Sequence, residues 1–273
     1  MSRIAGRFQS LAEQGRKALV PYIVAGDPGI DSTVPMMHEL VAAGADIIEL
    51  GVPFSDPMSE GPVIQLAHER ALANGVRLRD VLAMVAQFRE QDQETPVLLM
   101  GYANPVEHMG YAAFADAAAE VGLDALLTVD IPPEEVDAVN AELRRVAMDN
   151  IFLIAPTTPD ERIGVIAGQA SGFIYYVSLK GVTGAGNIDA ADVSANIARI
   201  RSHTELPVAV GFGIKDAASA STIAALADGV VVGSALVNLV AQRVQAGDSP
   251  AQASQAAAQL LSEIRQGIDS DPS

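Results

Sequence analysis

Short apolar runs alternate with longer amphipathic stretches from one end of the chain to the other. This alternation predicts repeated strand–helix units. Most of the runs are continuously apolar, which is typical of strands buried on both faces of a parallel sheet. The predicted strands lie at residues 18–26, 45–52, 96–103, 124–131, 150–156, 172–178, 207–213 and 229–234.

The stretches between these strands have the spacing of amphipathic helices, for example at residues 32–45, 78–93 and 111–122. Two of them end in a glycine shortly before the next strand, in the segments AAGAD and EVGLD. Eight repeated strand–helix units predict an α/β fold of the (β/α)₈ TIM-barrel type. An open doubly wound sheet is the second choice from the pattern alone. The pattern contains no linker, so we expect residues 1–273 to form one barrel domain.

Two further helices are expected at the ends of the chain. Residues 2–14 read as an extra N-terminal helix that closes one end of the barrel, and residues 249–267 as the last helix. The N-terminal segment has no uninterrupted apolar core of the signal-peptide type, and no apolar stretch is long enough to span a bilayer.

Composition narrows the possible compartments and cofactors. The chain has no Cys, which excludes disulfides and thiolate metal sites and fits a reducing compartment. The four histidines show no metal-ligand spacing, so no metal site is expected. We therefore predict a cytoplasmic protein with no membrane association, whose hydrophobic fraction of 49% supports a sizeable core.

The net charge of −17 argues against a nucleic-acid partner, because phosphates would be repelled. It does not exclude a small anionic ligand, which backbone N–H groups can bind locally. The acidic, Lys-poor composition is explained equally well by a high-salt habitat and by ordinary drift toward Asp and Glu.

The segment IELGVPFSDPMSEGP, residues 48–62, contains the first candidate chemistry. Glu49 sits among apolar residues near a strand end, where burial would raise its pKa into the range of an acid–base catalyst. A carboxylate satisfied by a neighbouring group is an equally good interpretation. Glu60 and Asp56 follow in an unusually long loop, although a solvated charge and a turn former are the commoner roles of such residues.

Glycines mark two further loops. SLKGVTGAGNIDA, residues 178–190, has the length and polarity of a mobile loop over a site. The pair Gly211-Phe212-Gly213 and Gly233-Ser234 follows the seventh and eighth predicted strands. In TIM barrels this is the common phosphate site, so the pair predicts a small phosphorylated ligand.

Together these motifs resemble the tryptophan synthase α subunit family. RKALVPYIVAGDP, IIELGVPFSDP, LLMGYANPV, GVTG and GFGI occur in the order and spacing of that family over about residues 3–266. The resemblance implies a (β/α)₈ barrel that cleaves indole-3-glycerol phosphate to indole and glyceraldehyde 3-phosphate in tryptophan biosynthesis. It also implies no cofactor in this chain and a β-subunit partner that carries pyridoxal phosphate, in an α₂β₂-type complex.

The resemblance assigns the two carboxylates their roles. Glu49 matches the acid–base residue, and Glu60 matches the carboxylate that accepts the indole N–H. Most members have Asp at the second position. The additional methylene of Glu60 would move the carboxylate by roughly 1.5 Å if the backbone stayed in place. Such a displacement can lower the rate by roughly 100-fold, so reduced efficiency is expected unless the loop compensates.

The same resemblance implies the remaining site residues. The substrate-binding positions are Tyr22 (Phe in many members), Ile64, Met100, Leu127, Tyr175, Thr183, Gly184, Phe212, Gly213, Gly233 and Ser234. The positions expected to contact the β subunit are Pro53, Asp56, Asn104 and Pro132.

Three other functions remain open at this point. Glu60 favours a catalytically impaired subunit that mainly binds and activates the β subunit. A stand-alone indole-releasing lyase would use the same chemistry, but the loop from Pro53 to Asp56 argues against it. A phosphosugar isomerase would leave the ELGVPFSDP segment unexplained.

Overall fold

In the computed structural model, which describes residues 2–178, 190–211 and 213–270, the strands form one parallel sheet. The strand order is β5-β4-β3-β2-β1-β9-β8-β7-β6. Its two outermost strands, β5 (Asp149–Asn150) and β6 (Phe152–Ile154), are pieces of one segment separated by Ile151. This segment pairs with β4 on one side and β7 on the other, so it closes the sheet into the predicted TIM barrel.

Within the described residues, every predicted strand run contains a strand of the structure, and only the fifth run is split. The remaining strands are β1 (Ala18–Val24), β2 (Ile48–Gly51), β3 (Val97–Gly101), β4 (Ala125–Thr128), β7 (Ile174–Val177), β8 (Val208–Gly211) and β9 (Gly229–Val232).

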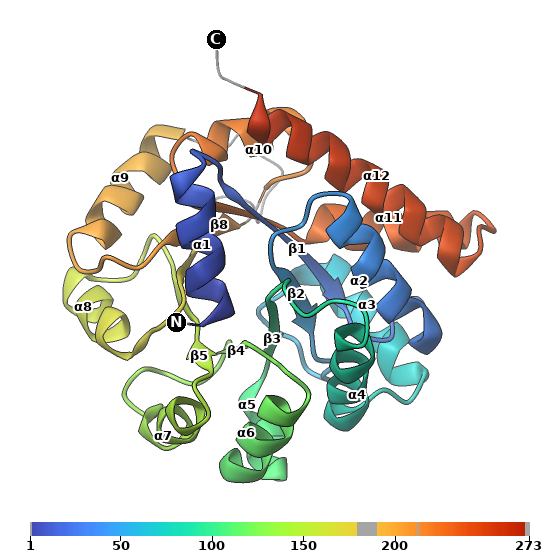
Figure 1. The fold of residues 1–273 in the computed structure, drawn as a ribbon, viewed down its shortest axis with the longest axis horizontal. Coiled ribbons are helices and arrows are strands. Elements are labelled where there is room, and N and C mark those ends of the chain that lie inside the picture. The colour runs from blue at the N-terminus through green and yellow to red at the C-terminus, as the bar shows by residue number, and fades with distance from the viewer. Residues whose placement is uncertain (1, 179–189, 212, 271–273) are drawn as a thin grey trace.

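The helices surround this barrel (Figure 1). Their bounds are α1 (Arg3–Glu13), α2 (Thr33–Ala42), α3 (Gly61–Ala73), α4 (Leu78–Arg89), α5 (Ala103–Met109), α6 (Tyr111–Glu120), α7 (Asp137–Arg145), α8 (Asp160–Gln169), α9 (Ala190–Arg201), α10 (Ala217–Ala224), α11 (Ser234–Gln245) and α12 (Pro250–Asp269), with a 3₁₀ turn at Ile30–Ser32. Within the described residues, no helix is long and apolar enough to cross a membrane.

Strand side chains alternate between two apolar layers. One set, which includes Ile48, Leu50 and Tyr176, packs outward against the surrounding helices. The other set, which includes Leu127 and Tyr175, packs inside the barrel. This alternation places Glu49, which lies between Ile48 and Leu50, on the interior side of β2.

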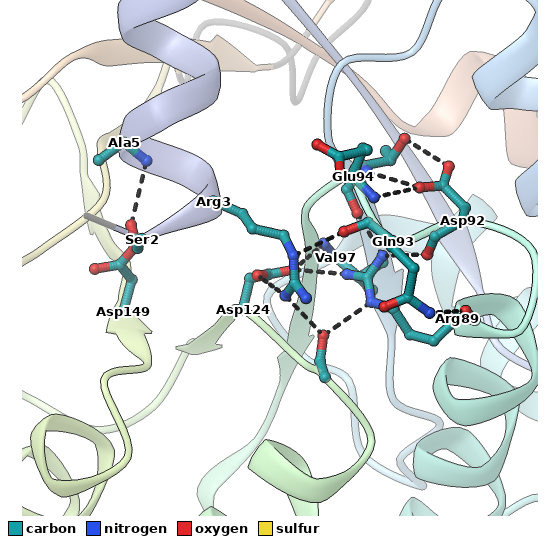
Figure 2. A network of polar contacts seen from close by, with 12 residues as sticks. Ser2, Arg3, Ala5, Arg89, Asp92, Gln93, Glu94, Val97, Asp124 and Asp149 are labelled. Carbon is teal, nitrogen blue, oxygen red and sulfur yellow. Dashed lines mark hydrogen bonds and ion pairs between the residues drawn. The ribbon is translucent and has the colours of Figure 1, made fainter.

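The extra N-terminal helix was predicted, and α1 lies across one end of the barrel (Figure 1). Its buried residues Ile4, Phe8 and Leu11 belong to the interior apolar cluster. Figure 2 shows the polar contacts at the start of the helix, where Arg3 reaches Asp124 at 2.7 Å and the Ser2 hydroxyl donates to Asp149. Apolar burial and polar contacts together hold α1 on the barrel.

A Gly-x-Asp segment precedes both β2 and β4. In each segment the aspartate carboxylate accepts a backbone N–H at the beginning of the neighbouring strand, that of Leu19, the second residue of β1, for Asp46 and that of Val97, the first residue of β3, for Asp124. Each aspartate also pairs with an arginine that is at least nine-tenths buried, Arg265 at 3.1 Å and Arg89 at 2.7 Å.

The glycines of these segments, Gly44 and Gly122, have positive φ, and the stems of the two arginines pack closely on them. The glycines that end helices therefore also make room for the buried arginines. Both segments lie at the end of the barrel opposite the loops that follow the strands.

Candidate active site

A cavity of about 540 Å³ opens at the carboxyl ends of the strands. This is the end of a TIM barrel at which active sites are built. Its apolar lining includes Val63, Ile64, Met100, Val129, Leu153, Ile154 and Val177. A planar aromatic ligand would find apolar surroundings among these side chains.

Glycines and the start of a helix also line the cavity. Gly213 follows β8, and Gly233 and Ser234 follow β9 and begin α11, whose first N–H groups have no helical partners. Exposed Lys215 also lines the cavity. Free N–H groups, a helix N-terminus and an ammonium group together suit a phosphate.

Glu60 also lines the cavity, directly before α3, and its side chain is only 4% exposed. The Tyr22 hydroxyl donates to its Oε2 atom at 2.7 Å, and His68 Nε2 lies 3.2 Å from the same oxygen. Its Oε1 atom is buried and has no hydrogen-bond partner among the described residues. One oxygen is therefore held by the protein, while the other is unpartnered among the described residues.

Glu49 is completely buried in β2, and neither carboxylate oxygen has a hydrogen-bond partner among the described residues. Burial raises the pKa of Glu49 to about 8, and the charge of Glu60 acts in the same direction. Glu49 is not among the residues that line the cavity, although its strand neighbour Tyr22 is. At neutral pH this carboxyl group is mainly protonated and lies beneath the cavity surface.

Two tyrosines complete the floor of the site, and each depends on a glycine in the adjacent strand. A Cβ atom on Gly51 would lie 2.4 Å from the Tyr22 hydroxyl oxygen. A Cβ atom on Gly211 would lie 2.4 Å from that of Tyr175. Burial, assisted by the two glutamates, raises the pKa of both tyrosines well above the ordinary value, so both hydroxyls keep their protons.

The comparisons with known proteins point to one family. The family model described as tryptophan synthase alpha chain matches residues 8–268. The tryptophan synthase alpha chain of Thioalkalivibrio sulfidiphilus is 60% identical to this chain, and the match covers 98% of this chain and 100% of that relative. That of Nitrosococcus oceani is 59% identical, with 98% of each chain covered.

A solved structure agrees in fold. The crystal structure of tryptophan synthase subunit alpha from Legionella pneumophila superposes with a TM-score of 0.91 at 47% identity, over 98% of this chain and 99% of that one. The chain belongs to the tryptophan synthase α-chain family. Membership confirms the predicted fold, the predicted family and the prediction of a carbon–carbon lyase.

Most positions that the family resemblance implied for the substrate lie around the cavity. Of the implied positions, those in the lining are the substrate-binding candidates Tyr22, Ile64, Met100, Tyr175, Gly213, Gly233 and Ser234, together with the catalytic candidate Glu60. Leu127 is fully buried in the barrel interior and does not line the cavity. Thr183, Gly184 and Phe212 lie outside the described residues.

The positions that the tryptophan synthase family implies for the β subunit follow three adjacent strands. Asp56 follows β2 and is exposed, Asn104 follows β3 and is exposed, and Pro132 follows β4 and is half-buried. Pro53 is buried within this chain. All four lie at the same end of the barrel as the cavity.

The sequence interpretation missed His68, Lys215 and Asn238. His68 lies four residues after Ile64, on the buried face of α3, and this helical spacing was the available signal. Lys215 follows GFG and was visible as one of the few lysines. Asn238 lies four residues after Ser234 in α11 and gave no separate signal.

Proposed function

We propose that the cavity is the site at which this chain cleaves indole-3-glycerol phosphate, with Glu49 and Glu60 as the two reacting carboxyl groups. The observation that carries the proposal is a pair of buried glutamates, Glu60 in the lining of the cavity and Glu49 beneath it, with apolar side chains and the glycines after β8 and β9 in the same lining. The indole ring would contact the apolar side chains, and the phosphate would bind at Gly213, Gly233 and Ser234. The glycerol carbons would then lie between the ring and the phosphate.

The protonated Glu49 is suited to begin the reaction. It would donate its proton to indole C3, which leaves an indoleninium cation, and the Glu60 carboxylate would stabilise the N–H of that cation. Glu49 would then take the proton of the glycerol hydroxyl as the carbon–carbon bond breaks. The bonding electrons return to the ring, the aldehyde forms, and Glu49 regains its proton, so the cycle closes without net proton uptake.

Because Glu49 lies beneath the cavity surface, its side chain must rotate toward the substrate before it can react. Catalytic geometry often tightens only when the substrate binds, so the buried position in the free chain is compatible with this role.

Glu49→Gln tests the assignment through the rate of indole release. The expected loss is about 10³-fold or more, because one group acts as both acid and base. Glu39→Gln is the matched control, since burial also raises the pKa of Glu39, which lies in α2 and does not line the cavity. If Glu49→Gln released indole at the rate of the unmodified chain, the proposed role of Glu49 would be wrong.

We further propose that the chain works in the cytoplasm in an α₂β₂-type complex with a β subunit that carries pyridoxal phosphate. Exposed Asp56 and Asn104, together with Met58 at 83% exposure, support this surface as the contact. Indole release should rise strongly when a tryptophan synthase β subunit is added. Stimulation of the β reaction without indole release would instead support the impaired subunit.

A further inference from the structure

His68 has a defined protonation pattern that follows from its contacts. The backbone N–H of Phe54 donates to His68 Nδ1 at 3.0 Å, so this nitrogen carries no proton. A neutral ring must then carry its proton on Nε2. That nitrogen lies 3.2 Å from Glu60 Oε2 and 3.3 Å from the Tyr22 hydroxyl oxygen. The charged carboxylate is the stronger acceptor of the two, so His68 donates to Glu60.

Tyr22 and His68 therefore hold one oxygen of Glu60 from two different elements, β1 and α3. All three side chains are at least nine-tenths buried, which strengthens hydrogen bonds to a charged acceptor. Because both donors reach Oε2, the orientation of the carboxyl group is fixed and Oε1 remains unpartnered. The Phe54 contact also ties His68 to the loop after β2.

The distances match the length of a glutamate. Aspartate at this position would withdraw the carboxylate by roughly 1.5 Å. The contacts of 2.7 and 3.2 Å would then exceed hydrogen-bond distance if the backbone stayed in place. The longer side chain and its two donors are therefore a matched set.

We propose that Tyr22 and His68 are positioning residues, which orient Glu60 so that its Oε1 atom accepts the N–H of an indole ring. The proposal rests on the function proposed above and adds a physical reason why glutamate serves where most family members have aspartate. Loss of either donor, Tyr22 or His68, would then have the same effect as a displacement of the Glu60 carboxylate.

Two substitutions at His68 separate its contacts. His68→Asn keeps an acceptor near Nδ1 for the Phe54 N–H but has no atom that reaches Glu60. His68→Gln places an amide N–H near the former Nε2 and keeps the donor to Glu60. A role through Glu60 therefore predicts that Gln preserves function better than Asn.

Indole binding is the first measurement, because it does not depend on turnover. The chain has no Trp, so the fluorescence of indole itself reports the dissociation constant. Tyr22→Phe and His68→Asn should each weaken indole binding by about tenfold, the effect of one hydrogen bond to a charged group. His68→Gln should weaken binding by less than about threefold. Tyr176→Phe, at a buried tyrosine in the outer layer, is the matched control.

A double substitution tests whether His68 acts through Glu60. In a Glu60→Gln background, His68→Asn should weaken indole binding by less than about twofold further. A full tenfold effect in that background would overturn the proposal, as would equal losses for His68→Asn and His68→Gln. Urea midpoints measured on the same variants show whether folding is affected.

The rate of indole-3-glycerol phosphate cleavage is the second measurement. Glu60→Asp, Tyr22→Phe and His68→Asn should each lower kcat/KM by about tenfold or more, because the contact with the indole N–H is lost in the bound substrate as well as in the transition state. An increase of kcat/KM in Glu60→Asp would contradict the inference that the length of the Glu60 side chain matches its two donors. If the unmodified chain cleaved no substrate, the proposed function would fail, while indole titration would still test the positioning role.

Discussion

At the scale of single residues, the site combines two glutamates in opposite situations. Glu60 is held by donors through one oxygen, whereas Glu49 has no hydrogen-bond partner among the described residues. Glu49 therefore has the raised pKa and the freedom to exchange a proton, and Glu60 has the fixed orientation that recognition of an N–H group requires. The apolar neighbours of Glu49 predicted its burial, but only the structure shows that it lies beneath the cavity surface.

The raised pKa of Glu49 also makes stability depend on pH. Its pKa is about 8 in the folded chain and ordinarily 4.5. The folded state therefore retains a proton that the unfolded chain releases, and this contribution to stability is fully present below pH 4.5. It is lost as the pH rises to about 8, and the total loss is at most about 5 kcal/mol.

Glu49→Gln should remove this dependence. We expect the variant to become progressively more stable than the unmodified chain between pH 5 and pH 9, as measured by urea unfolding. Glu39→Gln, whose half-buried carboxyl group also has a raised pKa, should show a smaller trend. A constant stability difference across this pH range would mean that Glu49 ionises normally in the folded chain.

Gly51 is a second residue whose identity the site requires. Its Cβ atom would overlap the Tyr22 ring, so Gly51→Ala should displace the tyrosine and weaken its contact with Glu60. We expect destabilisation by about 1–3 kcal/mol, typical of overpacking, and a loss of kcat of about tenfold or more.

Gly168→Ala is the matched control for Gly51→Ala, because no atom lies within 4 Å of the added Cβ in α8. It should leave indole release unchanged and raise stability by about 0.5–1 kcal/mol through the higher helix propensity of Ala. Normal activity of Gly51→Ala, measured beside this control, would show that the Tyr22 ring can move without consequence.

At the scale of elements, apolar runs predicted the strands well because each is buried on both faces. The fifth run also predicted a strand, but the break at Ile151 depends on hydrogen bonds to two different neighbours, which the sequence does not specify. His68 was missed for a related reason. Its place on the buried face of α3 follows from helical spacing, but its contact with Glu60 at the start of the same helix depends on the direction of both side chains.

The Gly-x-Asp segments give a testable case of element anchoring. Asp124 binds the start of β3 and pairs with buried Arg89 and with Arg3 of α1 (Figure 2). Asp124→Asn keeps an acceptor for the strand N–H but leaves Arg89 without its charged partner. Breaking a buried pair in this way should lower the free energy of unfolding by about 3–5 kcal/mol in urea titrations.

Asp228 provides the comparison for this substitution. It also accepts the N–H that starts a neighbouring strand, that of Val208 in β8, but its ion pair with Arg201 is solvent-exposed. Asp228→Asn should lower stability by about 1 kcal/mol or less. Equal losses for Asp124→Asn and Asp228→Asn would show that burial of the arginine is not the cause.

At the scale of the whole molecule, the excess of acidic groups opposes compaction. The chain carries a net charge of −17, and self-repulsion of this kind weakens the folded state most at low ionic strength. Salt screens exposed charges, and the Debye length falls from about 30 Å at 0.01 M to about 3 Å at 1 M. The buried pairs Arg89–Asp124 and Arg265–Asp46 lie out of solvent and are screened less.

The thermal midpoint should therefore rise with added NaCl, by about 2–4 °C for each kcal/mol of repulsion that is removed. Replacing exposed Glu120 and Glu205 by Lys makes the net charge less negative and should reduce the response to salt. Since neither glutamate forms an ion pair among the described residues, the double variant changes the overall field without breaking a contact. A thermal midpoint that falls with salt would mean that exposed ion pairs outweigh the repulsion, and that the acidic composition does not limit stability.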